Sequence, residues 1–203
     1  GALPIYETSG AHGNTKGSGY RTDSNSANIK FALPGDGLVD VHHSIKGSGS
    51  AHTVTNVGGS NTTTTSQFYG SSLDLNSTWS QTLHAPYSAD FLNGYNGNFT
   101  IETWVKTTTT SRSIASVWDY GNNKKCWNMY ITASGPVLIV STDGSSQTDL
   151  ALTGTELCHT GTWCHVAFVR NSNTVKCYVN GFEAGSTSFS GTLYNTTDAK
   201  LYI

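Results

Sequence analysis

Short segments in which apolar and polar residues alternate, separated by turn-forming residues, constrain the fold of this chain more than any other feature. The string FTIETWVK at residues 99–106 has the composition of a β-strand and its side-chain period of two. Further strand-like segments follow at residues 114–118, 127–132 and 137–142, each bounded by Gly, Asn or Ser. Many short strands at regular spacing are typical of a sandwich or a barrel. We therefore predict an all-β domain in which helix is a minor component.

The clearest hairpin is predicted in the last quarter of the sequence. Residues 163–170 and 174–180 have strand composition, and the residues Asn171, Ser172 and Asn173 separate them. Asn tolerates the left-handed backbone that such a turn requires. These two segments are therefore expected to pair antiparallel.

The beginning of the chain is organised differently. Residues 1–28 hold few apolar side chains and show no sustained period, so we expect an extended N-terminal arm there. The run IKFALP at residues 29–34 alternates and ends at a Gly-Asp-Gly turn, which predicts a first strand. The predicted organisation is thus an arm, residues 1–28, followed by a β-domain, residues 29–203.

The predicted strands also suggest which side chains form the core. Residues Phe99, Ile101 and Val105 should be buried together, in one core with Ile131, Val137 and Ile139. Trp104 projects from the opposite face of its strand, yet core packing is the expected role of both Trp104 and Trp163.

The charge balance argues against a nucleic-acid partner, and the lengths of the apolar runs argue against membrane insertion. Only 12% of the residues are charged and the formal net charge is −2, so there is no basic excess to neutralise phosphates and we expect no nucleic-acid partner. No apolar run approaches the roughly 20 residues of a membrane helix, so we expect no membrane insertion.

Four cysteines occur, all in the second half of the chain: Cys126, Cys158, Cys164 and Cys177. Their spacing contains no Cys-x-x-Cys pair and matches no usual zinc site. One interpretation is a disulfide between Cys158 and Cys164 across a short loop. The other, which we favour here because secreted disulfide scaffolds are smaller and richer in cysteine, is free thiols.

Several phrases of the sequence resemble those of one protein family. The strings FTIETWV at residue 99, WCHVAFVR at residue 163 and YVNG at residue 178 are similar to phrases of laminin-G-like jelly rolls, and weaker matches precede them in the right order from residue 38 onward. The resemblance implies a concanavalin A-like fold, an antiparallel two-sheet jelly-roll sandwich. The Gly/Ser/Thr-rich lead-in and the arm resemble the version found in structural proteins of tailed, especially marine, phages. That resemblance implies a location on the virion surface or outside the cell.

The sequence departs from the family pattern at two places. Where the family carries an acidic turn that helps to hold calcium, residues 74–80 offer one carboxylate, Asp74. Calcium takes roughly six to eight oxygen ligands, so a calcium site here is the disfavoured alternative to the expectation that the chain holds no cofactor. The family's final strand is also not found before residue 203. A sandwich without it would leave an open sheet edge beside residues 199–203, which predicts a homo-oligomer, in a fibre a trimer.

Catalytic chemistry is not indicated by the sequence. Glycoside hydrolases need two placed carboxylates, and Glu102 is the lone Glu in a well-predicted strand, so we expect no enzyme activity. The neighbouring residues Asp40, His42 and His43 are interpreted as part of a solvated loop, and no metal site is expected. By the family resemblance, His165 satisfies a hydrogen bond within the sandwich.

One aromatic segment suggests ligand binding. Trp118 and Tyr120 share a face of a predicted strand, next to Asp119, Asn122 and Asn123. Aromatic rings stack on the apolar faces of sugars, and amides and carboxylates bond sugar hydroxyls. These five residues form the predicted ligand site.

These predictions favour a non-enzymatic surface module of a phage virion, a tail-fibre or capsid appendage. Its partners would be host glycans or neighbouring virion proteins. The first alternative is a secreted bacterial carbohydrate-binding or adhesion module. A glycoside hydrolase is a second, disfavoured alternative, because the acid pair is not found in the sequence.

Overall fold

The computed structural model describes residues 25–35, 37–68, 70–75, 81–119, 121–150, 158 and 160–203. The chain divides into two compact units, residues 1–83 and residues 84–203. Most of the predicted arm, residues 1–24, lies outside the described residues, and so do Tyr120 and five residues of the doubtful calcium segment, 76–80.

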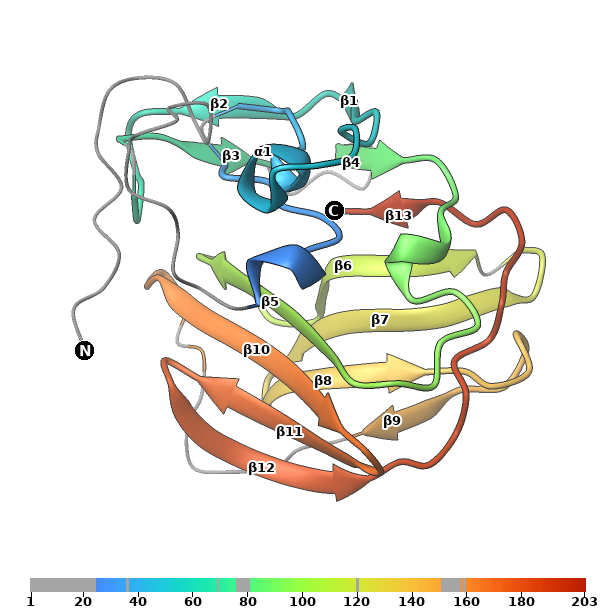
Figure 1. Ribbon diagram of the computed structural model, residues 1–203. Helices are drawn as coiled ribbons and strands as arrows, with labels where there is room; N and C mark the ends of the chain where they lie inside the picture. The colour runs from blue at the N-terminus through green and yellow to red at the C-terminus, as the bar shows by residue number, and fades with distance from the viewer. Residues whose placement is uncertain are drawn as a thin grey trace. The chain divides into compact units, whose positions relative to one another are not determined.

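The second unit holds two antiparallel sheets (Figure 1). The smaller sheet has the order β12–β11–β10–β5, with β5 at Phe99–Val105, β10 at Cys164–Asn171, β11 at Thr174–Val179 and β12 at Phe182–Ser188. In the larger sheet the order within this unit is β4–β13–β6–β7–β8–β9, the strands being Thr82–Ala85, Leu201–Tyr202, Arg112–Asp119, Lys124–Thr132, Gly135–Val140 and Thr148–Leu150. The prediction of an all-β fold with antiparallel sheets is confirmed.

Alternation along the strands builds the core of this unit. On β10 the residues Val166 and Phe168 are fully buried, and on the larger sheet Met129 and Leu138 are too. Each such side chain contributes about 1.5–3 kcal/mol when it leaves water. Phe168 pairs with Ile101 across the ladder, so β5 and β10 present one apolar surface.

One part of the predicted core is wrong. Val137 and Ile139 pack with Trp118 in a cluster of their own, while Leu138, between them, pairs with Met129. Successive strand residues point to opposite faces, so Val137 and Ile139 lie on the face opposite to Leu138. All six residues of β8 are buried, which removes the alternation that would have revealed its orientation.

The predicted hairpin is confirmed. Strands β10 and β11 pair from Asn171 with Thr174 to Val166 with Val179. Ser172 takes the left-handed turn position at φ 54°, and its N–H donates to the Asn98 side chain at 2.7 Å.

Strand β13 lies between β4 and β6 in the larger sheet and pairs with both of them. Leu201 pairs with Ala85 of β4 on one side and with Val117 of β6 on the other. Because both edges of β13 are hydrogen-bonded, residues 201 and 202 do not form the open edge that was expected beside residues 199–203.

The preference for free thiols is wrong for two of the four cysteines. Cys158 and Cys164 form a disulfide with Cα atoms 5.5 Å apart, a spacing that suits this bond. Cys126 and Cys177 are free and buried. The low cysteine content of the whole chain did not exclude this bond. A disulfide requires only that the fold bring two cysteines close together, here at the two ends of one short loop.

The first unit contains little regular structure in its described part. It has a turn of 3-10 helix η1 at Ser26–Asn28, a short helix α1 at His42–Lys46, and strands β1 at Thr55–Val57, β2 at Ser60–Thr62 and β3 at Ser72–Asp74. Strands β2 and β3 pair antiparallel. No described helix is long and apolar enough to cross a membrane.

Two predictions for this unit are wrong. Residues 29–34 form no strand, because the main chain of Ala32 bonds the Asp40 side chain and the Val41 N–H instead of a neighbouring strand. Asp40 and His42 are also not part of a solvated loop. Both are buried, and His42 begins helix α1 with its N–H bonded to the Asp40 carboxylate.

Candidate functional site

The outer face of the smaller sheet presents polar and aromatic side chains together. Strand alternation places Ile101 and Thr103 toward the core and Glu102 and Trp104 on the outer face. Across the ladder, Trp104 pairs with His165 and Glu102 pairs with Ala167. We call this surface the β5–β10 face, defined by Glu102, Trp104, His165, Ala167 and, on β11, Tyr178.

Trp104 is the exposed ring of this face. It is 38% exposed, and its ring centroid lies 5.3 Å from that of His165 with the planes tilted by 42°. The His165 Nε2 lies 3.5 Å from a Glu102 carboxylate oxygen. An indole ring, an imidazole and a carboxylate therefore occupy neighbouring positions at the surface.

The backbone beneath these side chains is fixed at the end of β11. The N–H of His165 donates to the Asn180 side-chain oxygen at 2.9 Å, and the N–H of Asn180 donates back to the His165 carbonyl at 2.9 Å. Asn180 has a φ of 51°, a conformation that Asn tolerates better than most residues. The hydrogen bond expected of His165 within the sandwich is thus made by its main chain, while its ring faces outward.

A third strand extends the row of polar side chains. Tyr178 pairs with Ala167 on one side and with Glu183 of β12 on the other. The Lys176 Nζ lies 2.8 Å from a Glu183 carboxylate oxygen, and this hydrogen bond raises the pKa of Lys176. Ala167, between the longer side chains of Glu102 and Tyr178, is itself almost fully covered.

The face does not place two carboxylates at the spacing of a glycoside hydrolase. Glu102 on β5 and Glu183 on β12 are separated by β10 and β11. With strands roughly 4.8 Å apart, the two residues lie on the order of 14 Å from each other. The acid pairs of these enzymes are about 5–9.5 Å apart.

The ligand site predicted from the sequence falls on the turn between β6 and β7. Asp119 and Asn122 are brought together, since the Asn122 side-chain amide donates to the Asp119 carboxylate at 2.8 Å. The other Asp119 oxygen accepts the N–H of Gly121 at 3.0 Å. Asn122 and Asn123 are exposed, and Asn123 takes a left-handed turn position. The Asp119 carboxylate thus holds the turn.

The structure does not place the Trp118 ring at this exposed turn. Trp118 is only 6% exposed and packs with Val137 and Ile139 on its sheet. On the smaller sheet, an exposed aromatic ring beside polar groups is Trp104, for which core packing was predicted. The strand period gave the signal for it, because Trp104 projects from the face opposite to Phe99 and Ile101.

Comparisons with known proteins come from sequence and from structure. The sequence model of the concanavalin A-like lectin/glucanases superfamily, of the laminin G type, matches residues 76–203, more than half of the chain. No match was found among curated protein sequences.

Solved structures share the fold at low identity. The binding domain of Paraclostridial Mosquitocidal Protein 1 superposes with a TM-score of 0.63 at 14% identity, over 85% of this chain and 42% of that one. The receptor binding domain of botulinum neurotoxin C/D mosaic serotype gives 0.58 at 16%, over 82% and 40%. Domain 4 of AbnA, a GH43 extracellular arabinanase from Geobacillus stearothermophilus solved with arabinotriose, gives 0.54 at 19%, over 82% and 77%. The chain spans about two fifths of the first two of these structures, and all three likenesses concern the fold alone.

Proposed function

The chain belongs to the concanavalin A-like lectin/glucanases superfamily, and from this premise we propose that it is a non-enzymatic module that binds glycans through the β5–β10 face. The observation that carries the proposal is the exposure of Trp104 beside Glu102 and His165. A large ring that is exposed at the surface of a sheet can contact a ligand, whereas the ring of a core tryptophan cannot.

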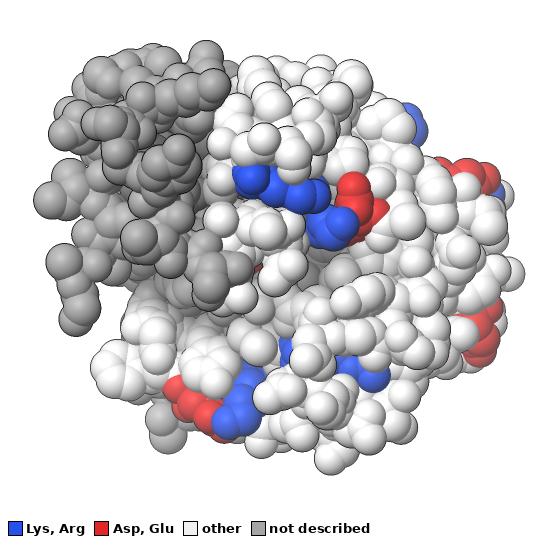
Figure 2. All heavy atoms as spheres, in the orientation of Figure 1, with Lys and Arg blue, Asp and Glu red and all other residues white. Residues whose placement is uncertain are grey.

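The chemistry of the β5–β10 face suits a sugar. The apolar side of a pyranose or furanose ring stacks on an indole, and its hydroxyls both donate and accept hydrogen bonds. Glu102 accepts such bonds, and the His165 ring can do either, depending on its tautomer. On the side of the molecule drawn in Figure 2, the coloured acidic and basic side chains are interspersed and form no large patch of one sign. This supports a ligand with little or no net charge.

The solved structures of similar fold support a binding role. They include a domain named for receptor binding and a domain solved with a bound arabinose oligosaccharide. For this chain we therefore propose that the ligand is a glycan, namely a linear oligosaccharide long enough to reach from Trp104 to Tyr178.

The setting that we propose is the virion surface or the outside of a cell. The resemblance of the lead-in to phage structural proteins favours a tail-fibre or capsid appendage that contacts host glycans, assembled as a homo-oligomer. The second candidate is a secreted bacterial carbohydrate-binding or adhesion module, and the Cys158–Cys164 disulfide suits both settings, because disulfides persist in secreted proteins and on virion surfaces. Mass spectrometry of purified virions and of bacterial culture medium would decide between the two candidates by which of the two samples contains the chain.

A glycan array followed by calorimetry tests the proposed site. The Trp104→Ala variant should lose at least about tenfold in affinity for the best oligosaccharide, roughly 1.4 kcal/mol. The matched control is Phe182→Ala, which removes another exposed ring, 67% exposed, from the same sheet. Equal binding by the Trp104→Ala variant and the native chain would refute the β5–β10 face as the site, and the absence of any glycan ligand would refute the function.

A further inference from the structure

Three of the four buried side chains in the described part of the first unit are polar. Among its described residues, those that are buried are Asp40, His42, Ser72 and Leu83. Asp40 is completely inaccessible and His42 is 5% exposed. Polar side chains gain little from apolar burial, and a metal ion is one of the groups that hold small domains together. The buried polar side chains in the described part of the first unit are therefore a candidate ion site.

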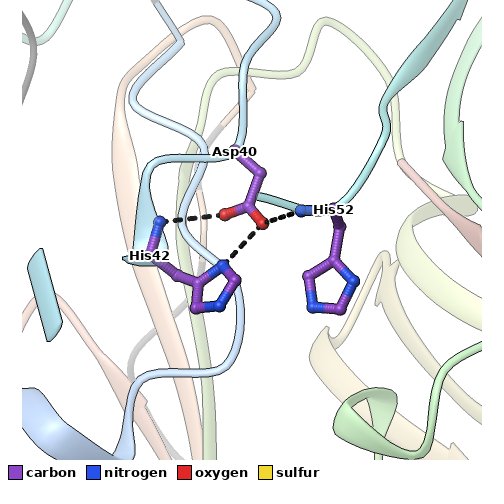
Figure 3. Close-up of side chains that lie close together, drawn as sticks. All are labelled: Asp40, His42 and His52. Atoms are coloured by element: carbon purple, nitrogen blue, oxygen red, sulfur yellow. Dashed lines mark hydrogen bonds and ion pairs between the residues drawn. The ribbon is translucent and has the colours of Figure 1, made fainter. Parts of the chain in front are cut away.

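Asp40 and His42 meet a third potential metal ligand, His52, which is ten residues further along the chain. One ligand atom from each of Asp40, His42 and His52 lies within 4.8 Å of the others. Figure 3 shows the two imidazole rings side by side, with the carboxylate next to both residues. The ring centroids are 5.0 Å apart and the planes differ by 28°.

The Asp40 carboxylate is held in place by the main chain. One oxygen accepts the N–H groups of Ala32 and His42, each at 3.0 Å, and the other accepts the N–H of His52 at 2.8 Å. The second oxygen also lies 2.7 Å from Nδ1 of the His42 ring. The site thus contains a buried carboxyl group whose orientation is fixed by main-chain hydrogen bonds.

The orientation of His52 is that of a metal-binding histidine. Its Nε2 lies 3.2 Å from the carbonyl oxygen of Lys30. A carbonyl oxygen only accepts hydrogen bonds, so Nε2 carries the hydrogen and Nδ1 carries the lone pair. A hydrogen bond from the far ring nitrogen to a backbone carbonyl is the usual support of a histidine that binds a metal through its near nitrogen.

We propose that Asp40, His42 and His52 bind one divalent transition-metal ion, of the zinc class, that clips residues 30–52 together. Two imidazoles and one carboxylate suit zinc and its neighbours in the first transition row, whereas calcium requires more oxygen ligands. Zinc–nitrogen bonds of about 2.0–2.1 Å place two ligand atoms roughly 3.3 Å apart in a tetrahedral site. His42 Nδ1 and the Asp40 oxygen, which are 2.7 Å apart, therefore separate slightly on binding, and longer separations, of up to 4.8 Å, shorten. His42 binds through Nδ1, and its hydrogen moves to Nε2.

Calorimetry on the full chain, stripped with EDTA and titrated with zinc sulfate, tests this proposal. The native chain should bind one zinc ion, and the same titration with cobalt chloride should produce the visible absorption of a low-symmetry cobalt site. The variants His52→Ala and Asp40→Asn should lose this binding. His52 is partly exposed, so its replacement tests the site even where the Asp40 variant fails to fold.

The neighbouring histidine gives the matched control. His43 adjoins the site, with its ring centroid 6.0 Å from that of His42, but it does not belong to the three-ligand group. His43→Ala should bind zinc with an affinity within about threefold of the native chain. Zinc binding that survives in His52→Ala, or a native chain that binds no zinc, would overturn the proposal. Preferential binding of calcium over zinc would overturn the assigned class of ion.

Discussion

The two units of this chain are stabilised by different kinds of interaction. In the second unit, two sheets bury apolar side chains such as Phe168 and Met129 between them. In the described part of the first unit, the centre is a carboxylate bonded to three main-chain N–H groups and an imidazole. Apolar burial is not directional and tolerates small shifts, whereas a polar centre depends on the position of each donor. The comparison teaches that one chain can combine a robust framework with a part that single-atom changes disrupt.

The largest effect is expected in the apolar core. Phe168→Ala removes a fully buried ring between β5 and β11, and should lower the free energy of unfolding of the second unit by about 3–5 kcal/mol. Denaturant unfolding followed by tryptophan fluorescence measures this change. Phe182→Ala, at an exposed position, should stay within about 0.5 kcal/mol of the native chain. Similar losses in the two variants would contradict the assignment of the core.

An intermediate effect is expected at the polar centre. Asp40→Asn replaces the charged acceptor of three N–H groups and brings an amide donor among them, which should cost the first unit about 1.5–3 kcal/mol. Hydrogen exchange in the presence of EDTA should show faster exchange of the amides of Ala32, His42 and His52. The same replacement at the exposed residue Asp149 should leave these amides unchanged. If the amides of β10 also exchanged faster in the Asp40→Asn variant, the proposed difference in stabilisation between the two units would be contradicted.

The smallest effect concerns two thiols and depends on pH. Burial raises the pKa of both Cys126 and Cys177 to about 12. An ordinary cysteine has a pKa of about 8.5, so near pH 8 the folded protein should react with a thiol reagent very slowly and the unfolded one rapidly. The pKa of each thiol is higher in the folded state than in the unfolded state. The resulting contribution to the free energy of unfolding is therefore fully present below the unfolded pKa and is lost as the pH rises toward 12. A chromogenic disulfide reagent should count two thiols after unfolding and four after reduction. Rapid labelling of the folded chain would show that the second unit opens more easily than its packing implies.

The same contrast decides what could be predicted from the sequence. The strands β5 and β10 and the hairpin to β11 were predictable because their residues alternate and a short turn joins them. Strand β8 was found but misoriented, since a run that is buried on both faces has no period. The exposure of Trp104 could be inferred from its place in the period of β5, although core packing was the prediction.

Contacts between distant residues were beyond the reach of these patterns. Nothing in a run of residues indicates that His52 lies beside Asp40 and His42, because their meeting depends on how the chain turns back after α1. The strand predicted at residues 29–34 failed for the same reason, since its main chain bonds the Asp40 loop. Polar centres are built from such turns, and their residues carry no period that a sequence reader can detect.

The position of β13 has a consequence for how quickly the second unit folds. Ala85 and Val117 belong to the same sheet but are connected through Leu201, which is more than eighty residues further along the chain. Pairings between residues so far apart raise the contact order, and domains with high contact order cross their folding barrier slowly. During synthesis, β6 leaves the ribosome well before β13, so the edge of β6 that pairs with β13 stays unpaired until the end of the chain has been made. The growing chain therefore passes through a stage in which a chaperone, or a second nascent chain, can reach that edge first.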